Sequence, residues 1–133
     1  MLNESYFFIK NKSRNLVNDF LKSMNKYIYK KTINQMKLLE IYGINTNCVS
    51  IKKFQNDIWK IRAKDASNNV RVYFYMIENK IYYLYAFYKS TQKTPENKKI
   101  VINNLKKELL ISLKKRDFEL YLEKVDFNLL EQK

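Results

Sequence analysis

Cations and aromatic residues occupy alternate positions in two apolar stretches, and these are the residues best suited to chemistry. They are Lys60, Arg62, Arg71, Tyr73 and Tyr75. A period of two places such side chains on one face of a β-strand. Guanidinium groups bind phosphate through paired hydrogen bonds, and tyrosine rings can stack on unpaired bases. The pattern therefore predicts a sheet with one apolar face and one face that presents cations and aromatics.

The chain has no histidine and one cysteine, Cys48. Histidine-based triads, histidine-ligated metal sites and structural zinc clusters are thereby excluded, and no internal disulfide can form. Any catalysis must use Lys, Arg, Tyr, Asp and Glu, and we expect no metal and no cofactor. A single cysteine is typical of a reducing compartment, so we expect a cytoplasmic protein.

The charge balance indicates a polyanionic partner. The 133 residues include 26 Lys and Arg against 13 Asp and Glu, a formal net charge of +13. Such a chain attracts nucleic acid through counterion release. Twenty-two of the cations are lysines, and with many Asn, Ile and Tyr they fit an AT-rich genome. The four arginines are more informative because lysine cannot replace the guanidinium fork: Arg14, Arg62, Arg71 and Arg116.

The hydrophobic periodicity predicts one domain over residues 1–133, with strands and helices in succession. The longest uncharged apolar stretch, Ile81–Tyr88, is too short to span a bilayer, and Met1–Ser5 carries an acid where a signal peptide carries a cation. We therefore expect neither a membrane span nor a signal peptide. The expected strands are Ser5–Lys10, Ile58–Lys64, Val70–Ile77 and Lys80–Lys89, and the expected helices are Arg14–Met24, Lys26–Tyr42, Glu96–Lys115 and Arg116–Leu130.

Three segments together resemble the RelE/HigB toxin superfamily, specifically its phage-derived HigB-like branch. The resemblance covers about residues 7–109, and its most specific part is a strand ending in Phe-x-Lys followed by Thr-Gln-Lys-Thr-Pro. The segments are Ile58-Trp59-Lys60-Ile61-Arg62, Asn69 to Tyr75, and Leu84 to Pro95. The resemblance implies an α+β fold in which an N-terminal helical hairpin packs on a small antiparallel RelE/ParE-like sheet, followed by C-terminal helices over about residues 110–133.

The resemblance also implies a function. The implied function is that of a type II toxin that acts as a ribosome-dependent mRNA endoribonuclease. In the implied reaction a ribose 2′-hydroxyl of the RNA attacks the adjacent phosphate. By motif position Arg62 and Arg71 would bind the phosphate, and Lys89 and Lys93 would act as base or electrostatic groups. Lys60, Tyr73, Tyr75 and Gln92 would contact RNA. The chain departs from the family pattern at three positions, Lys60, Tyr85 and Ser90.

The implied partners are mRNA on the ribosome and an antitoxin protein of helix-turn-helix type. Leu16, Phe20, Ile28 and Tyr29 exceed what one core face requires, so we expect the antitoxin to dock near the N-terminal helices. An acidic antitoxin segment covering Arg62, Arg71 and Lys89 is the other arrangement.

Other readings stay open at this point. The chain could be a ParE-like topoisomerase inhibitor, a non-catalytic RNA-binding module on the same fold, or a structural ribosomal or phage protein. The arginines could pair with Asp57 and Asp65, and the tyrosines could serve in packing.

Overall fold

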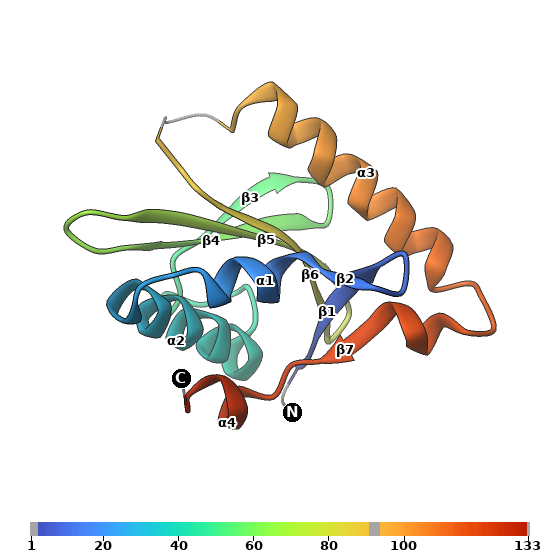
Figure 1. Ribbon diagram of the computed structural model, residues 1–133, viewed down its shortest axis with the longest axis horizontal. Coiled ribbons are helices and arrows are strands. Elements are labelled where there is room, and N and C mark those ends of the chain that lie inside the picture. The colour runs from blue at the N-terminus through green and yellow to red at the C-terminus, as the bar shows by residue number, and fades with distance from the viewer. Residues whose placement is uncertain (1–2, 91–93, 133) are drawn as a thin grey trace.

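The computed structural model describes residues 3–90 and 94–132 (Figure 1). The chain begins with a strand, and most of the sheet is complete before the last long helix. The elements in order are β1 (Glu4–Lys10), β2 (Arg14–Asn15), α1 (Leu16–Lys22), α2 (Lys26–Tyr42), β3 (Ile51–Gln55), β4 (Ile58–Lys64), β5 (Asn69–Ile77), β6 (Lys80–Tyr88), α3 (Glu96–Ser112), the 3-10 helix η1 (Phe118–Tyr121), β7 (Leu122–Lys124) and α4 (Phe127–Leu130).

The sheet has seven strands and is mixed. Its order is β2-β1-β6-β5-β4-β3, and β7 pairs with β1. The three successive strands predicted between Ile58 and Lys89 are confirmed as β4, β5 and β6, which pair antiparallel in succession. β1 pairs parallel with β6, with Glu4 opposite Lys80. Local alternation cannot reveal this pairing, since the paired residues are 76 positions apart in the sequence.

The predicted fold class is wrong. The fold is a seven-stranded mixed sheet that starts at the N-terminus, in place of an N-terminal helical hairpin on a small antiparallel sheet. The reason lies in where the first two helices bury their apolar stripes. α1 packs mainly on β6 and α2 on β4, so each helix covers part of one broad sheet face.

Helices cover both faces of the sheet (Figure 1). On one face Leu21 of α1 and Met36 of α2 pack with Val72 and Phe74 of β5. On the other face Leu105 and Leu109 of α3 pack with sheet residues that include Tyr73. The apolar area buried on each face stabilises the fold. The sheet is therefore the central layer of three.

The apolar positions expected to attract a partner on the first helices belong to the core. Ile28 is fully buried, Tyr29 is 4% exposed, and the Tyr29 hydroxyl donates to the carbonyl oxygen of Leu130 at 2.8 Å. Phe20 packs edge-on against Tyr88, with ring centroids 5.0 Å apart. The sheet and the C-terminal segment use these side chains, so they are not surplus to the core, and docking of an antitoxin near the first helices stays a prediction.

The helix predicted over Lys26–Tyr42 is confirmed as α2. The Asn25 side chain caps it by accepting from the backbone N–H groups of Tyr27 and Ile28. It ends at Gly43, whose φ of 73° is a conformation that glycine adopts without strain. The helix predicted over Arg116–Leu130 is wrong: η1, β7 and α4 occupy that range. Within residues 3–90 and 94–132, no helix has the length and hydropathy needed to cross a membrane.

Candidate functional site

The strand register collects five cations at one end of the sheet, and we call them the cation cluster. Lys52 of β3 lies opposite Lys60 of β4, and Arg62 of β4 lies opposite Arg71 of β5. Lys89 follows β6, and its backbone N–H donates to the Asn69 carbonyl at 2.7 Å, which holds it beside the start of β5. The cation cluster is thus Lys52, Lys60, Arg62, Arg71 and Lys89.

Lys60 is the most perturbed cation of the cluster. It is 8% exposed. Burial and then repulsion from Lys89 and Arg71, with smaller contributions from Lys52 and Arg62, lower its pKa from 10.5 to about 8. A substantial fraction of this amine is therefore neutral near physiological pH, and a neutral amine can accept a proton.

Lys89 and Arg71 are perturbed in the same direction. Burial lowers the pKa of Lys89, the charges of Arg71 and Lys52 lower it further, and a hydrogen bond with Lys60 opposes them. Burial and the Arg62 guanidinium lower the pKa of Arg71, although an arginine remains protonated in a protein. The members of the cation cluster therefore repel one another, and an anion placed among them would relieve that repulsion.

The cation cluster has few acidic neighbours. Within the described part of the chain, no ion pair involves Lys52, Lys60, Arg62 or Arg71. Asp65, a conceivable partner, instead accepts from the backbone N–H groups of Ser67 and Asn68 in its own turn. The ion-pair reading of the two arginines is therefore not supported by the structure.

Arg71 is held in place and still has a donor to offer. Its Nη1 donates to the Asn69 side chain and to the Val70 carbonyl at 3.1 Å. Its Nε is buried, and among the described residues it has no hydrogen-bond partner. A buried donor without a partner is costly. A phosphate oxygen is the type of acceptor that a guanidinium Nε binds.

Tyr73 forms the floor beneath the cluster. It is fully buried, its ring stacks on Phe87 at a centroid distance of 5.6 Å, and Lys60 Nζ lies 5.8 Å from its centroid. The Tyr73 and Thr94 hydroxyls are 2.6 Å apart and hydrogen-bonded. Tyr75 is 5% exposed. The expectation of an exposed aromatic face is wrong, because α3 packs over Tyr73 and Tyr75.

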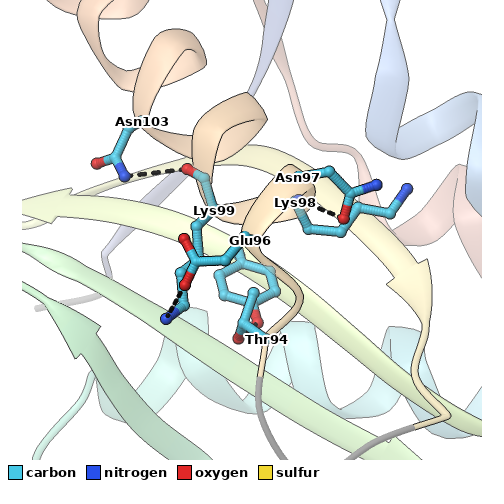
Figure 2. Close-up of polar contacts among 7 residues, drawn as sticks. Thr94, Glu96, Asn97, Lys98, Lys99 and Asn103 are labelled. Carbon is cyan, nitrogen blue, oxygen red and sulfur yellow. Dashed lines mark hydrogen bonds and ion pairs between the residues drawn. The ribbon is translucent and has the colours of Figure 1, made fainter.

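The start of α3 lies beside the floor, because Thr94, just before this helix, is hydrogen-bonded to Tyr73. Figure 2 shows Thr94 and the first turn of the helix. Lys98 Nζ lies over the Tyr85 and Phe87 rings, at 5.3 and 5.5 Å from their centroids, and donates to the Tyr85 hydroxyl at 3.2 Å. Lys99 pairs with Glu96 at 3.2 Å, as Figure 2 shows. The contacts of Thr94 and Lys98 fix the first turn of α3 to the sheet next to the cation cluster.

The sequence-predicted site residues divide into three groups. Lys60, Arg62, Arg71 and Lys89 come together. Tyr73 and Tyr75 lie beneath the surface. Gln92 and Lys93 lie outside the described residues. Sequence reasoning missed Lys52 and Asn69, since Lys52 lies in a run of two adjacent lysines that hides the strand.

The family match spans most of these elements. A protein-family model described as Phage derived protein Gp49-like (DUF891) matches residues 19–107, more than half of the chain and every member of the cation cluster. The chain belongs to the Gp49-like family. This family is associated with toxin–antitoxin toxins of the RelE/HigB type. No curated protein matches the chain significantly.

Proposed function

We propose that this Gp49-like protein is the toxin of a toxin–antitoxin pair and cleaves mRNA on the ribosome. The observation that carries the proposal is the cation cluster, in which Lys60, of lowered pKa, lies among four other cations with two arginines facing each other across β4 and β5. Positive charge at the phosphoryl oxygens and a base near the 2′-hydroxyl are what RNA cleavage by transesterification requires.

The cleavage step assigns a role to each side chain. The 2′-oxygen attacks the adjacent phosphorus as neutral Lys60 takes its proton, and the bond to the 5′-oxygen breaks. The products are a 2′,3′-cyclic phosphate and a 5′-hydroxyl end, with a protonated group of the cluster giving its proton to the leaving oxygen. Arg62 and Arg71 bind the phosphoryl oxygens and stabilise the charge that develops there. Lys89 and Lys52 add electrostatic attraction for the RNA backbone.

The proposed partner is an antitoxin that covers the cation cluster. Ile28 and Tyr29 are buried and would not contact an antitoxin that docks near the first helices. An acidic segment that pairs with the cluster would neutralise it and block RNA at the same place.

The test is cleavage of a translated mRNA by the purified protein with ribosomes, with the new 5′ ends mapped by primer extension. We expect cuts within codons by the wild-type protein and none by Arg71→Ala. Arg71→Lys should also fail, because lysine cannot bind phosphate through a bidentate fork. Arg116→Ala is the matched control, since Arg116 is exposed and outside the cluster.

Three results would contradict the proposal or one of the roles it assigns. Full cleavage by Arg71→Lys would reduce the role of Arg71 to diffuse charge. Binding of RNA without cleavage by the wild-type protein would favour the alternative of a non-catalytic RNA-binding module, and intact mRNA together with inhibition of a topoisomerase would favour the ParE-like alternative.

A further inference from the structure

Lys60 lies among other cations, and Lys89 shares these surroundings. Each of the two lysines has Arg62, Arg71 and two further lysines as neighbours, but Lys60 is the one that lies two residues from Arg62 on the same strand, β4. Its 8% exposure and its contact with the Tyr73 ring hold it among these cations. A nucleophilic amine therefore lies beside a place where a phosphate group would bind.

The spacing suits a small molecule that carries both a phosphate and an electrophilic carbon. Lys60 and Arg62 are two residues apart on β4 and project from the same face, about 7 Å apart along the strand. Arg71 lies directly opposite Arg62. A phosphate held by the two guanidinium groups would present its substituent toward the neighbouring position, which is that of Lys60.

We propose that Lys60 is acylated by acyl phosphates, small metabolites in which a carboxylic acid is joined to phosphate, with Arg62 and Arg71 binding the phosphate. The neutral amine of Lys60 attacks the carbonyl carbon and forms a carbon–nitrogen bond. The carbon–oxygen bond to phosphate breaks, inorganic phosphate leaves with the electron pair, and the amine proton passes to solvent. The product is an amide on Lys60, and no other reactant is needed.

Protonation favours this lysine as the nucleophile. With its pKa lowered to about 8, roughly a quarter of Lys60 is neutral at pH 7.5, against roughly a thousandth of a lysine of ordinary pKa. Nucleophilicity falls as basicity falls, so the net gain is smaller than this ratio. We expect Lys60 to react roughly tenfold faster than an exposed lysine.

Acylation would remove one charge from the cation cluster and replace the amine with an amide that cannot act as a base. The affinity for any polyanion should fall, because one fewer cation contributes to counterion release. The modification shares the phosphate-binding arginines with the proposed function but does not depend on RNA cleavage. It would couple this surface to the supply of activated carboxylic acids.

The experiment compares two acetyl donors on the full-length protein at pH 7.5. Acetyl phosphate carries the phosphate that the arginines would bind, whereas N-hydroxysuccinimide acetate carries none. After each reaction the protein is unfolded, the remaining amines are labelled with deuterated acetic anhydride, and mass spectrometry gives the acetylated fraction at every lysine. Lys53, an exposed lysine next to Lys52 on β3, is the internal reference.

We expect acetyl phosphate to label Lys60 roughly tenfold faster than Lys53, and to prefer Lys60 more strongly than the uncharged donor does. Inorganic phosphate in excess, or Arg62→Ala, should reduce that preference to the level of the uncharged donor. Arg62 is exposed, so this variant should fold. Equal labelling of Lys60 and Lys53, no labelling of Lys60, or a preference that phosphate does not reduce would each overturn the proposal. Because RNA is absent, the result stands whether or not the protein cleaves mRNA.

Discussion

Replacing Lys60 by methionine should stabilise the folded protein at neutral pH. Lys60 is buried among cations, and among the described residues no acid forms an ion pair with it. The folded state therefore binds its proton less tightly than the unfolded chain does. Methionine keeps an unbranched side chain that fills irregular space, and it removes the charge.

The magnitude follows from the pKa. A fall from 10.5 to about 8 corresponds to a ceiling of about 3 kcal/mol in the free energy of unfolding at pH 7. The exposed neighbours Lys52 and Arg62 admit water that screens part of this repulsion, so we expect a gain of about 1 to 2 kcal/mol. For a chain of this size the thermal midpoint should rise by about 4 to 8 °C.

The sign of the pH dependence makes the prediction specific. Between about pH 8 and pH 10.5 the unfolded chain holds the Lys60 proton and the folded chain does not, so the stability of the wild-type protein gains from this residue as pH rises. The advantage of Lys60→Met should therefore be full at pH 7 and less than half of that at about pH 9.5.

The assay is urea unfolding followed by the fluorescence of Trp59, the one tryptophan. Lys53→Met is the matched control, because Lys53 is an exposed lysine on the adjacent strand and outside the cation cluster. A loss of stability in Lys60→Met at pH 7, or a gain that is the same at both pH values, would refute the electrostatic reasoning.

Three further predictions concern the floor, the core and the chemistry. Tyr73→Phe removes the hydroxyl bonded to Thr94, so the free energy of unfolding in urea should fall by about 1 kcal/mol. Tyr27→Phe is the control, because Tyr27 is 77% exposed and removing its hydroxyl should not change that free energy measurably. Equal losses in the two variants would contradict the buried hydrogen bond. Leu109→Ala should cost about 2 to 5 kcal/mol because Leu109 of α3 is fully buried against the sheet. Ile111→Ala, at a residue 60% exposed on the same helix, should stay within about 0.5 kcal/mol. The kcat/KM for mRNA cleavage should rise with pH to a plateau above about 8, as Lys60 loses its proton; a rate that falls over this range would show that Lys60 acts only through its charge.

Sequence patterns predicted the elements whose signals are local. Strict alternation located β4, β5 and β6, and the apolar stripe before Gly43 located α2. The same alternation brought Lys60, Arg62 and Arg71 to one face, as the register shows. Whether these residues act on RNA stays a prediction.

The remainder could not be predicted, for physical reasons. The parallel pairing of β1 with β6 joins segments far apart in sequence. In β3 two adjacent lysines, Lys52 and Lys53, interrupt the alternation. Tyr73 and Tyr75 have polar hydroxyls, so their strand positions resemble an exposed face, although tyrosine rings bury as readily as other aromatics. Only the packing of α3 over them distinguishes the two cases.

The position of β1 has a consequence for biosynthesis. The first strand made is bracketed by β6 on one side and by β2 and β7 on the other. β7 pairs with it at Tyr6–Phe8, and the paired residues are 114 to 118 positions apart in the sequence. During translation the contacts of β1 therefore become possible in stages. Pairing with β2 is local, pairing with β6 requires the chain as far as Tyr83, and pairing with β7 requires it as far as Lys124. Until β6 has been made, Tyr6 and Phe7 lack a partner strand, and an unpaired apolar strand is prone to aggregation.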